Sequence, residues 1–368
     1  MGFLEILKKK NQVECFTTPS HSQSFFIFSK LRNFYKYDIS ETEAQNPEAA
    51  LFCAQKSAAK IYKTQSTHFL TNGSTSGIIA AVLACTKKHE DLRVPPRPLR
   101  ERVGVRGEKF LIWDKAHRCH NSSVILVGAQ PVFYEYEFDK DWGVYTIPKL
   151  NQIEEILKKE KIKALIITSP TYEGVVCDVE KISKLCKKYK TYLIVDEAHG
   201  ALYPFCDKLP KSAIYQGADF VIHSLHKTAG GLNPTALLHC NLKDIDIQSA
   251  LALISTTSPS YPMLASIEKN INFLNSKKGR AKILELIENI ENMKKNLPNL
   301  EFFKGDSTKI LTKHPELSGF ELSKILFEKY KIEDEISNQK SVMFLTGLGT
   351  SAKKLAGLEK MLKKINIS

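Results

Sequence analysis

The chain has 368 residues, of which 43% are hydrophobic and 25% are charged, a composition that is typical of a folded protein and excludes a largely disordered one. The formal net charge of +13 comes mainly from lysines spread along helical segments, so we interpret it as solvated helix faces and expect no nucleic-acid partner. The apolar runs at 25–28 and 164–167 are too short to span a bilayer, and we expect no membrane association.

The chain begins, at 1–11, with a lysine-bearing amphipathic stretch that lacks the apolar core of a secretion signal. The eight cysteines show no Cys-x-x-Cys spacing and no compact framework. We therefore expect reduced, mostly buried thiols, no metal site, and a soluble cytoplasmic protein.

Strand-like and helix-like runs alternate along the middle of the chain, which indicates a mostly parallel sheet flanked by helices. We predict an α/β fold with an arm at 1–45, a large domain at 46–265, and a helical linker with a small α+β domain at 266–368. In chain order, the pattern predicts a helix at 78–86, a strand at 110–113, a helix at 123–127, a strand at 131–136, a helix at 150–161, a strand at 164–168, a helix at 179–190, strands at 192–196 and 220–222, helices at 264–279, 283–295 and 321–330, a strand at 341–346 and a helix at 352–365.

One segment interrupts this alternation. Residues 91–108 contain three prolines, two glycines and five of the eight arginines in the chain, and the flanking segments would join smoothly without them. We predict an inserted surface loop without fixed structure. The functional alternative is an arm that binds anions.

The predicted strand at 192–196 ends on Asp196, and Lys227 follows 31 residues later in a Ser-Leu-His-Lys-Thr run. A lone buried lysine is usually half of a structural ion pair, and the Asp-Glu-Ala-His run that starts at Asp196 would also suit a nucleotide or metal site. Together the two residues suit pyridoxal phosphate, which needs an amine for a Schiff base and an acid opposite its pyridine nitrogen. The pair therefore predicts this cofactor.

Gly73, Ser74 and Thr75 lie between the strand-like run at 68–71 and the helix predicted at 78–86. Backbone N–H groups at a helix N-terminus favour a dianionic phosphate, and small hydroxyl residues allow it to approach closely. We predict that these three residues bind the cofactor phosphate. The alternative is an ordinary Ser/Thr helix cap.

Six motifs in a fixed order make the chain resemble a short form of the Orn/Lys/Arg decarboxylase family, in the aspartate-aminotransferase-like (fold type I) branch of pyridoxal-phosphate enzymes. The similarity runs over roughly 16–270 and implies a large domain like that of PLP-dependent transferases. The motifs are Thr-Asn-Gly-Ser-Thr-Ser-Gly at 71–77, Ala-His-Arg-Cys at 116–119, Ser-Pro-Thr-Tyr-Glu-Gly at 169–174, Asp-Glu-Ala-His-Gly at 196–200, Ser-Leu-His-Lys-Thr at 224–228 and Ser-Thr-Thr-Ser-Pro-Ser-Tyr at 255–261.

The resemblance implies roles for three residues of the 224–228 run. Lys227 is the amine that holds the cofactor, and burial beside a cationic ring depresses the pKa of such a lysine. Ser224 and His226 add contacts to the phosphate, although His226 is also interpretable as a structural loop histidine.

Asp196 is expected to keep the pyridine nitrogen protonated, so that the ring accepts the electron pair left by bond cleavage. Ala198, two residues further along an extended chain, would pack on one face of the ring. By resemblance His117 stacks on the opposite face, with His120 as a competitor for that place. His199 orients ring or substrate groups, or is purely structural.

The absence of any arginine after Arg280 favours decarboxylation over transamination, because a transaminase of this type generally holds the substrate carboxylate with an arginine. Tight binding of the carboxylate in the ground state would not lower the barrier to its loss. The resemblance implies lysine, arginine or ornithine as substrate, and Glu333 and Glu335 as acidic partners of its distal cation. The alternative for these two residues is a solvated acidic turn.

Three hypotheses about the function remain. The first is decarboxylation of a basic amino acid to an amine and CO2, feeding diamine or polyamine formation. The second is another fold-type-I activity, such as an aminotransferase or a carbon–sulfur lyase, and the third is a vestigial cofactor-binding protein that is not an enzyme. The 255–261 motif resembles a stretch that approaches the neighbouring subunit's active site, which implies a homodimer or higher homo-oligomer with shared active sites.

Overall fold

The structure is a computed structural model that describes residues 14–15, 49–86 and 107–365. Nearly all of the predicted arm at 1–45 and of the predicted inserted loop at 91–108 therefore lies outside the described residues. Among the residues that are described, no helix combines the length and apolarity that a bilayer crossing requires.

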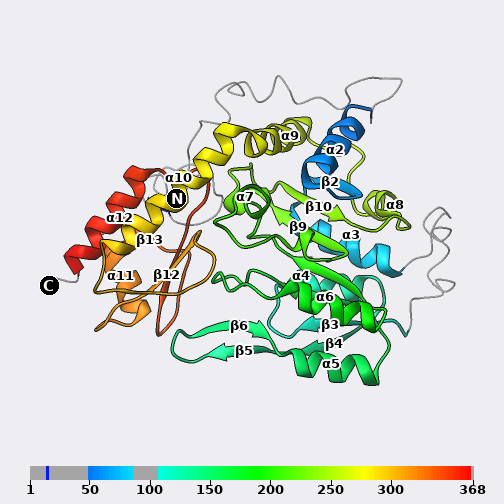
Figure 1. The fold of residues 1–368 in the computed structure, drawn as a ribbon, viewed down its shortest axis with the longest axis horizontal. Helices are drawn as coiled ribbons and strands as arrows, with labels where there is room; N and C mark the ends of the chain where they lie inside the picture. The colour runs from blue at the N-terminus through cyan, green and yellow to red at the C-terminus, as the bar shows by residue number, and fades with distance from the viewer. Residues whose placement is uncertain (1–13, 16–48, 87–106, 366–368) are drawn as a thin grey trace, which may run out of the picture.

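A seven-stranded sheet forms the centre of the molecule, in the order β2-β10-β9-β8-β7-β3-β4 (Figure 1). The strands from β9 to β4 run parallel, whereas β10 is antiparallel to both of its neighbours. The predicted α/β fold with a mostly parallel sheet is therefore confirmed. The strands are β2 (Ser66–Leu70), β3 (Lys109–Trp113), β4 (Gln130–Tyr134), β7 (Ile162–Thr168), β8 (Tyr192–Asp196), β9 (Phe220–Ser224) and β10 (Ala236–Cys240).

Helices cover both faces of this sheet, and alternate strand residues point to opposite faces. In β8, Leu193 and Val195 pack on the side of α2, α5, α6 and α9, whereas Ile194 packs on the side of α3, α4 and α8. Both faces are apolar because both are covered, as a parallel sheet requires. The helices are α2 (Ala49–Tyr62), α3 (Gly73–Thr86), α4 (Arg118–Leu126), α5 (Leu150–Lys159), α6 (Val179–Lys188), α8 (Ile247–Ala252) and α9 (Tyr261–Asn275).

A second sheet in the C-terminal part has the order β11-β12-β15-β14 and packs with three helices around its own apolar core (Figure 1). The hairpin of β5 (Tyr136–Asp139) and β6 (Val144–Pro148) reaches this sheet, where Val144 packs against it. A domain boundary near 265 remains a prediction. The elements are α10 (Lys277–Lys295), β11 (Glu301–Phe302), β12 (Lys309–Lys313), α11 (Gly319–Tyr330), β14 (Ile336–Ser337), β15 (Val342–Leu345) and α12 (Ala352–Ile365), with β13 (Ile332–Glu333) paired to β1 (Glu14–Cys15).

The helix predicted at 264–279 is in fact divided between α9 and α10. Ser276 separates the two helices, and its side chain caps α10 by accepting a hydrogen bond from the Gly279 N–H at 3.0 Å. A Cβ atom at Gly279 would lie 1.9 Å from the carbonyl oxygen of Phe273. The serine cap and the glycine therefore make the break, which helical periodicity alone does not reveal.

Candidate active site

Two neighbouring parallel strands of the central sheet end at the candidate site. Strand β8 ends at Asp196, and β9 ends at Ser224, after which the short helix α7 (Leu225–Thr228) carries Lys227. Because β8 and β9 are parallel, their carboxyl ends lie at the edge where open α/β sheets bind ligands. The charges of Asp196 and Lys227 act on one another. The fold thus brings together the two residues that the sequence singled out.

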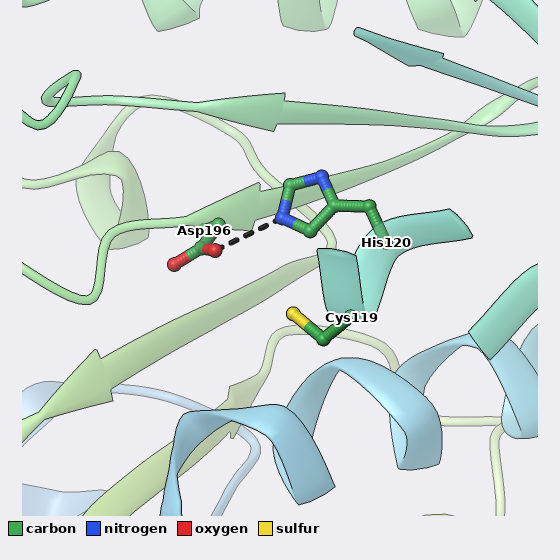
Figure 2. Close-up of side chains that lie close together, drawn as sticks. All are labelled: Cys119, His120 and Asp196. Atoms are coloured by element: carbon green, nitrogen blue, oxygen red, sulfur yellow. Dashed lines mark hydrogen bonds and ion pairs between the residues drawn. The ribbon is translucent and has the colours of Figure 1, made fainter. Parts of the chain in front are cut away.

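The Asp196 carboxylate is buried, and each of its oxygens has a partner. Oδ2 lies 2.9 Å from His120 Nε2, and Oδ1 accepts a hydrogen bond from the Ala198 N–H at 3.1 Å (Figure 2). Burial alone would raise the pKa of this carboxyl, but the hydrogen bond and charge of His120, together with the charge of Lys227, outweigh it and lower the pKa. Asp196 is therefore ionised at neutral pH.

The Lys227 amine lies 3.1 Å from His199 Nε2. Burial lowers the pKa of Lys227, and it lowers the pKa of His199 well below the ordinary value, with the Lys227 charge acting in the same direction on His199. His199 is therefore a neutral imidazole, and its Nε2 can accept a hydrogen bond from the amine. Its Nδ1 is buried and has no hydrogen-bond partner within the described part of the chain.

Gly73, Ser74 and Thr75 form the first turn of α3, where Gly73 has a φ of +76°. The sequence predicted that they lie between a strand and a helix, but they belong to the helix itself. The backbone N–H groups of a first helical turn have no partners within the helix. The Ser224 hydroxyl is buried and has no hydrogen-bond partner among the described residues. His226 Nδ1 lies 3.2 Å from the Thr235 carbonyl oxygen, so one of its ring nitrogens is already in contact with protein.

Two histidines at the start of α4 have different surroundings. His117 is exposed at the N-cap, with Nδ1 3.0 Å from Cys119 Sγ, and its stacking role remains a prediction. His120 is fully buried against Asp196, a contact that the sequence did not assign to it. No local sequence signal marked His120, because its role comes from its contact with Asp196.

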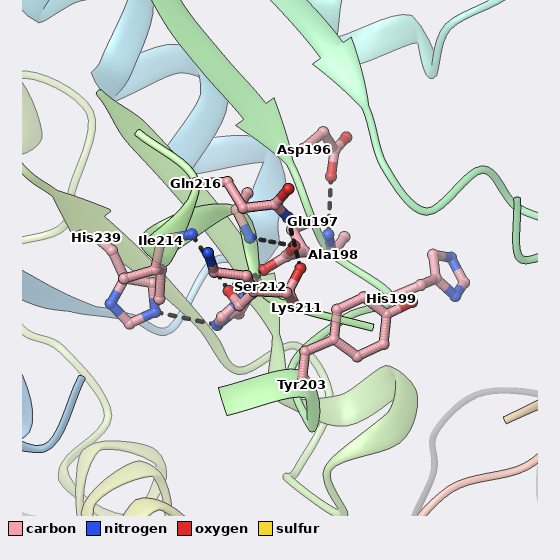
Figure 3. Close-up of polar contacts among 12 residues, drawn as sticks. Asp196, Glu197, Ala198, His199, Tyr203, Lys211, Ser212, Ile214, Gln216 and His239 are labelled. Carbon is pink, nitrogen blue, oxygen red and sulfur yellow. Dashed lines mark hydrogen bonds and ion pairs between the residues drawn. The ribbon is translucent and has the colours of Figure 1, made fainter. Parts of the chain in front are cut away.

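The chain turns after Asp196, so the expectation of an extended chain at Ala198 was wrong. The Ala198 N–H folds back onto Asp196 (Figure 3). The Ala198 carbonyl accepts a hydrogen bond from the Ser224 N–H at 3.1 Å. This turn links the ends of β8 and β9. Packing of Ala198 on the cofactor remains a prediction.

Glu197 points into a buried polar network behind the turn (Figure 3). Its carboxylate accepts a hydrogen bond from the Ser212 hydroxyl at 2.5 Å and lies 2.7 Å from His223 Nε2. The network continues from His223 to His239 at 3.1 Å and from His239 to Thr67 at 2.9 Å. These contacts tie β8, β9, β10 and β2 together beneath the site and fix the position of the residue next to Asp196.

Lys309, in β12 of the C-terminal sheet, is a further site residue that sequence reasoning missed. It forms a fully buried ion pair with Asp306 at 2.5 Å and donates a hydrogen bond to the His199 carbonyl oxygen at 3.1 Å. Tyr203 donates to the same Asp306 carboxylate at 2.8 Å. Lys309 thus connects the C-terminal part to the turn that holds His199. Its position at the start of an apolar run gave no sign of this burial.

Of the two acidic residues predicted to contact substrate, Glu335 lies near the candidate site. It accepts a hydrogen bond from the Tyr172 hydroxyl, and its charge acts on Lys227. The Tyr172 ring meets the His199 ring edge to face, with centroids 5.2 Å apart. Glu333 lies in the short strand β13 and pairs with Cys15.

The sequence of the chain is similar to those of known proteins. Residues 15–317 match the family described as Orn/Lys/Arg decarboxylase, major domain. An arginine decarboxylase of Bacillus anthracis is 27% identical over 372 residues, covering 93% of this chain and 71% of the relative. An ornithine decarboxylase of Haemophilus influenzae is 25% identical over 269 residues, covering 63% of this chain and 34% of the relative.

Solved structures share the fold at low sequence identity. The constitutive lysine decarboxylase of E. coli matches with a TM-score of 0.73 and 18% identity over 91% of this chain, which spans 54% of that protein. A sphingosine-1-phosphate lyase of Burkholderia pseudomallei matches with a TM-score of 0.73 and 13% identity over 98% of this chain and 88% of that protein. The match over 15–317 covers most of the sequence, and the chain belongs to the Orn/Lys/Arg decarboxylase family.

Proposed function

We propose that the protein is a pyridoxal-phosphate-dependent decarboxylase of a basic amino acid, either lysine, arginine or ornithine. The observation that carries this proposal is the placement of an amine, Lys227, and an ionised carboxylate, Asp196, at the ends of adjacent parallel strands. Membership of the Orn/Lys/Arg decarboxylase family supports the reaction class.

The residues at this edge of the sheet fit the cofactor's functional groups. Lys227 would carry its aldehyde carbon, and Asp196 would face its pyridine nitrogen. The Ser224 hydroxyl, which has no hydrogen-bond partner in the described part of the chain, and the first turn of α3, with Ser74 and Thr75, would bind its phosphate. When bound, pyridoxal phosphate supplies an acceptor for the electron pair that remains after a bond to the substrate α-carbon breaks.

The chain's own residues then have separate tasks. Asp196, kept ionised by His120, holds a proton on the facing nitrogen. The buried Lys227 amine loses its proton more easily than an exposed lysine, and a neutral amine is the reactive form. His199 Nε2, 3.1 Å away, can accept a hydrogen bond from this amine and so orient it. Lys309 positions His199 by binding its carbonyl oxygen.

The proposed substrate class rests on charge. Glu335 offers a carboxylate near Lys227, steadied by Tyr172, which suits the distal cation of a basic amino acid. No arginine follows Arg280 in the sequence, and Arg280 itself donates to the Phe205 carbonyl and to Asn275. The substrate carboxylate thus lacks a strong partner from this region, which favours its departure.

We further propose that the protein works in the cytoplasm as a homodimer with shared active sites and supplies diamines or polyamines. The family motif at 255–261 supports the dimer, because its residues 255–258 are exposed on the described chain. A partner subunit could cover this segment.

The proposal is tested by incubating purified protein and pyridoxal phosphate separately with lysine, arginine and ornithine, and by measuring CO2 and the amine formed. We expect one of the three to give stoichiometric CO2 and the corresponding amine. Formation of a keto acid that depends on an added acceptor would instead identify an aminotransferase. Cofactor binding without turnover of any of the three would support the vestigial alternative.

A further inference from the structure

Three different metal-ligating side chains converge at the start of α4 and the end of β8. The sulfur of Cys119, a ring nitrogen of His120 and a carboxylate oxygen of Asp196 all lie within 4.8 Å of one another. All three residues are buried, with exposed fractions of 5%, 0% and 7%. Figure 2 shows the thiol and the imidazole on neighbouring residues of one helix, both directed toward the carboxylate.

This donor set suits a particular class of cation. Zn²⁺ and Co²⁺ bind thiolate sulfur, imidazole nitrogen and carboxylate oxygen, whereas Mg²⁺ and Ca²⁺ prefer oxygen ligands alone. Three protein ligands leave one tetrahedral position for water or another small ligand. Separations below 4.8 Å need only small side-chain movements to surround one ion.

We propose that Cys119, His120 and Asp196 bind one Zn²⁺ ion per chain in the cofactor-free protein. The Cys119 thiol loses its proton to solvent when the ion binds, and its sulfur lies 3.0 Å from His117 Nδ1. His120 coordinates through the Nε2 atom that now faces Asp196, and its proton moves to solvent or to Nδ1. The thiolate and the carboxylate balance the two positive charges of the ion.

Such an ion would compete with pyridoxal phosphate for Asp196. This competition rests on the proposed function. Asp196 is the residue proposed to face the pyridine nitrogen, and the ion requires the same carboxylate. Zinc ions would therefore keep new protein in an inactive form until they are removed.

The site is tested with Co²⁺ added to cofactor-free protein, because a thiolate bound to Co²⁺ gives a charge-transfer absorbance in the near ultraviolet. We expect one Co²⁺ per chain with this absorbance, displaced by Zn²⁺. Cys119→Ser should abolish the absorbance and weaken binding at least about 100-fold. The matched control is Cys53→Ser, which removes an exposed thiol in α2 and should leave the signal intact.

If the wild-type protein shows no Co²⁺–thiolate absorbance, the proposed metal site is wrong, whatever the variants show. An unchanged signal in Cys119→Ser would also overturn the proposal. Protein first loaded with pyridoxal phosphate should lose the Co²⁺ signal, and equal Co²⁺ binding in loaded protein would overturn the competition. If pyridoxal phosphate fails to bind at all, the proposed function fails while the Co²⁺ signal of the cofactor-free protein still decides the metal site.

Discussion

Lys227→Ala is expected to lower kcat for decarboxylation at least about 1000-fold. Alanine has no amine, so the cofactor cannot be attached to the chain and the 3.1 Å contact with His199 is lost. The measurement is CO2 release under saturating substrate and cofactor. A variant that kept full activity would exclude the assigned role of Lys227.

The matched control is Lys184→Ala, which removes an exposed lysine of α6 that pairs with Glu180 one turn away. This change should leave kcat within about twofold, because both side chains are exposed and exposed ion pairs contribute only about 0.2–1 kcal/mol to stability. A comparable loss in both variants would point to a general effect of lysine removal.

Lys309→Met is expected to lower the free energy of unfolding by about 3–5 kcal/mol. Methionine keeps the length and apolar stem of the side chain but leaves the fully buried Asp306 carboxylate without its cation. It also removes the hydrogen bond to the His199 carbonyl. Urea unfolding of the cofactor-free protein measures the loss.

Lys208→Met provides the control for that experiment, since Lys208 pairs with Glu288 at 3.1 Å but both side chains are 54% exposed. Its expected cost is below about 1 kcal/mol. A Lys309→Met variant as stable as this control would mean that the buried pair does not hold the C-terminal part to the site.

Local sequence patterns predicted much of the fold. The strand at Tyr192–Asp196 and the helix at Ala352–Ile365 match the observed β8 and α12, because a short β-branched run and leucines at helical spacing are each distinctive. β10 (Ala236–Cys240) was missed, since a five-residue apolar run has too little periodicity to identify. Its antiparallel place between β2 and β9 depends on contacts between distant segments.

The candidate site also contains residues that the sequence predicted and residues that it did not. The Asp196 carboxylate and the Lys227 amine were predictable because each lies at or just after the end of a strand and belongs to a recognisable motif. His120 and Lys309 were not, since their importance comes from what they touch: Asp196 in one case, and Asp306 with the His199 carbonyl in the other. A lysine at the start of a strand is ordinarily exposed, and only the packing of the C-terminal sheet buries this one.

The most direct test of the account is to treat protein loaded with pyridoxal phosphate with borohydride, which makes the attachment to an amine permanent, and to locate the added mass by peptide mass spectrometry. We expect one pyridoxyl phosphate per chain, carried by Lys227. Labelling of a different lysine as the main product, or no labelled peptide from protein that has bound the cofactor, would contradict it.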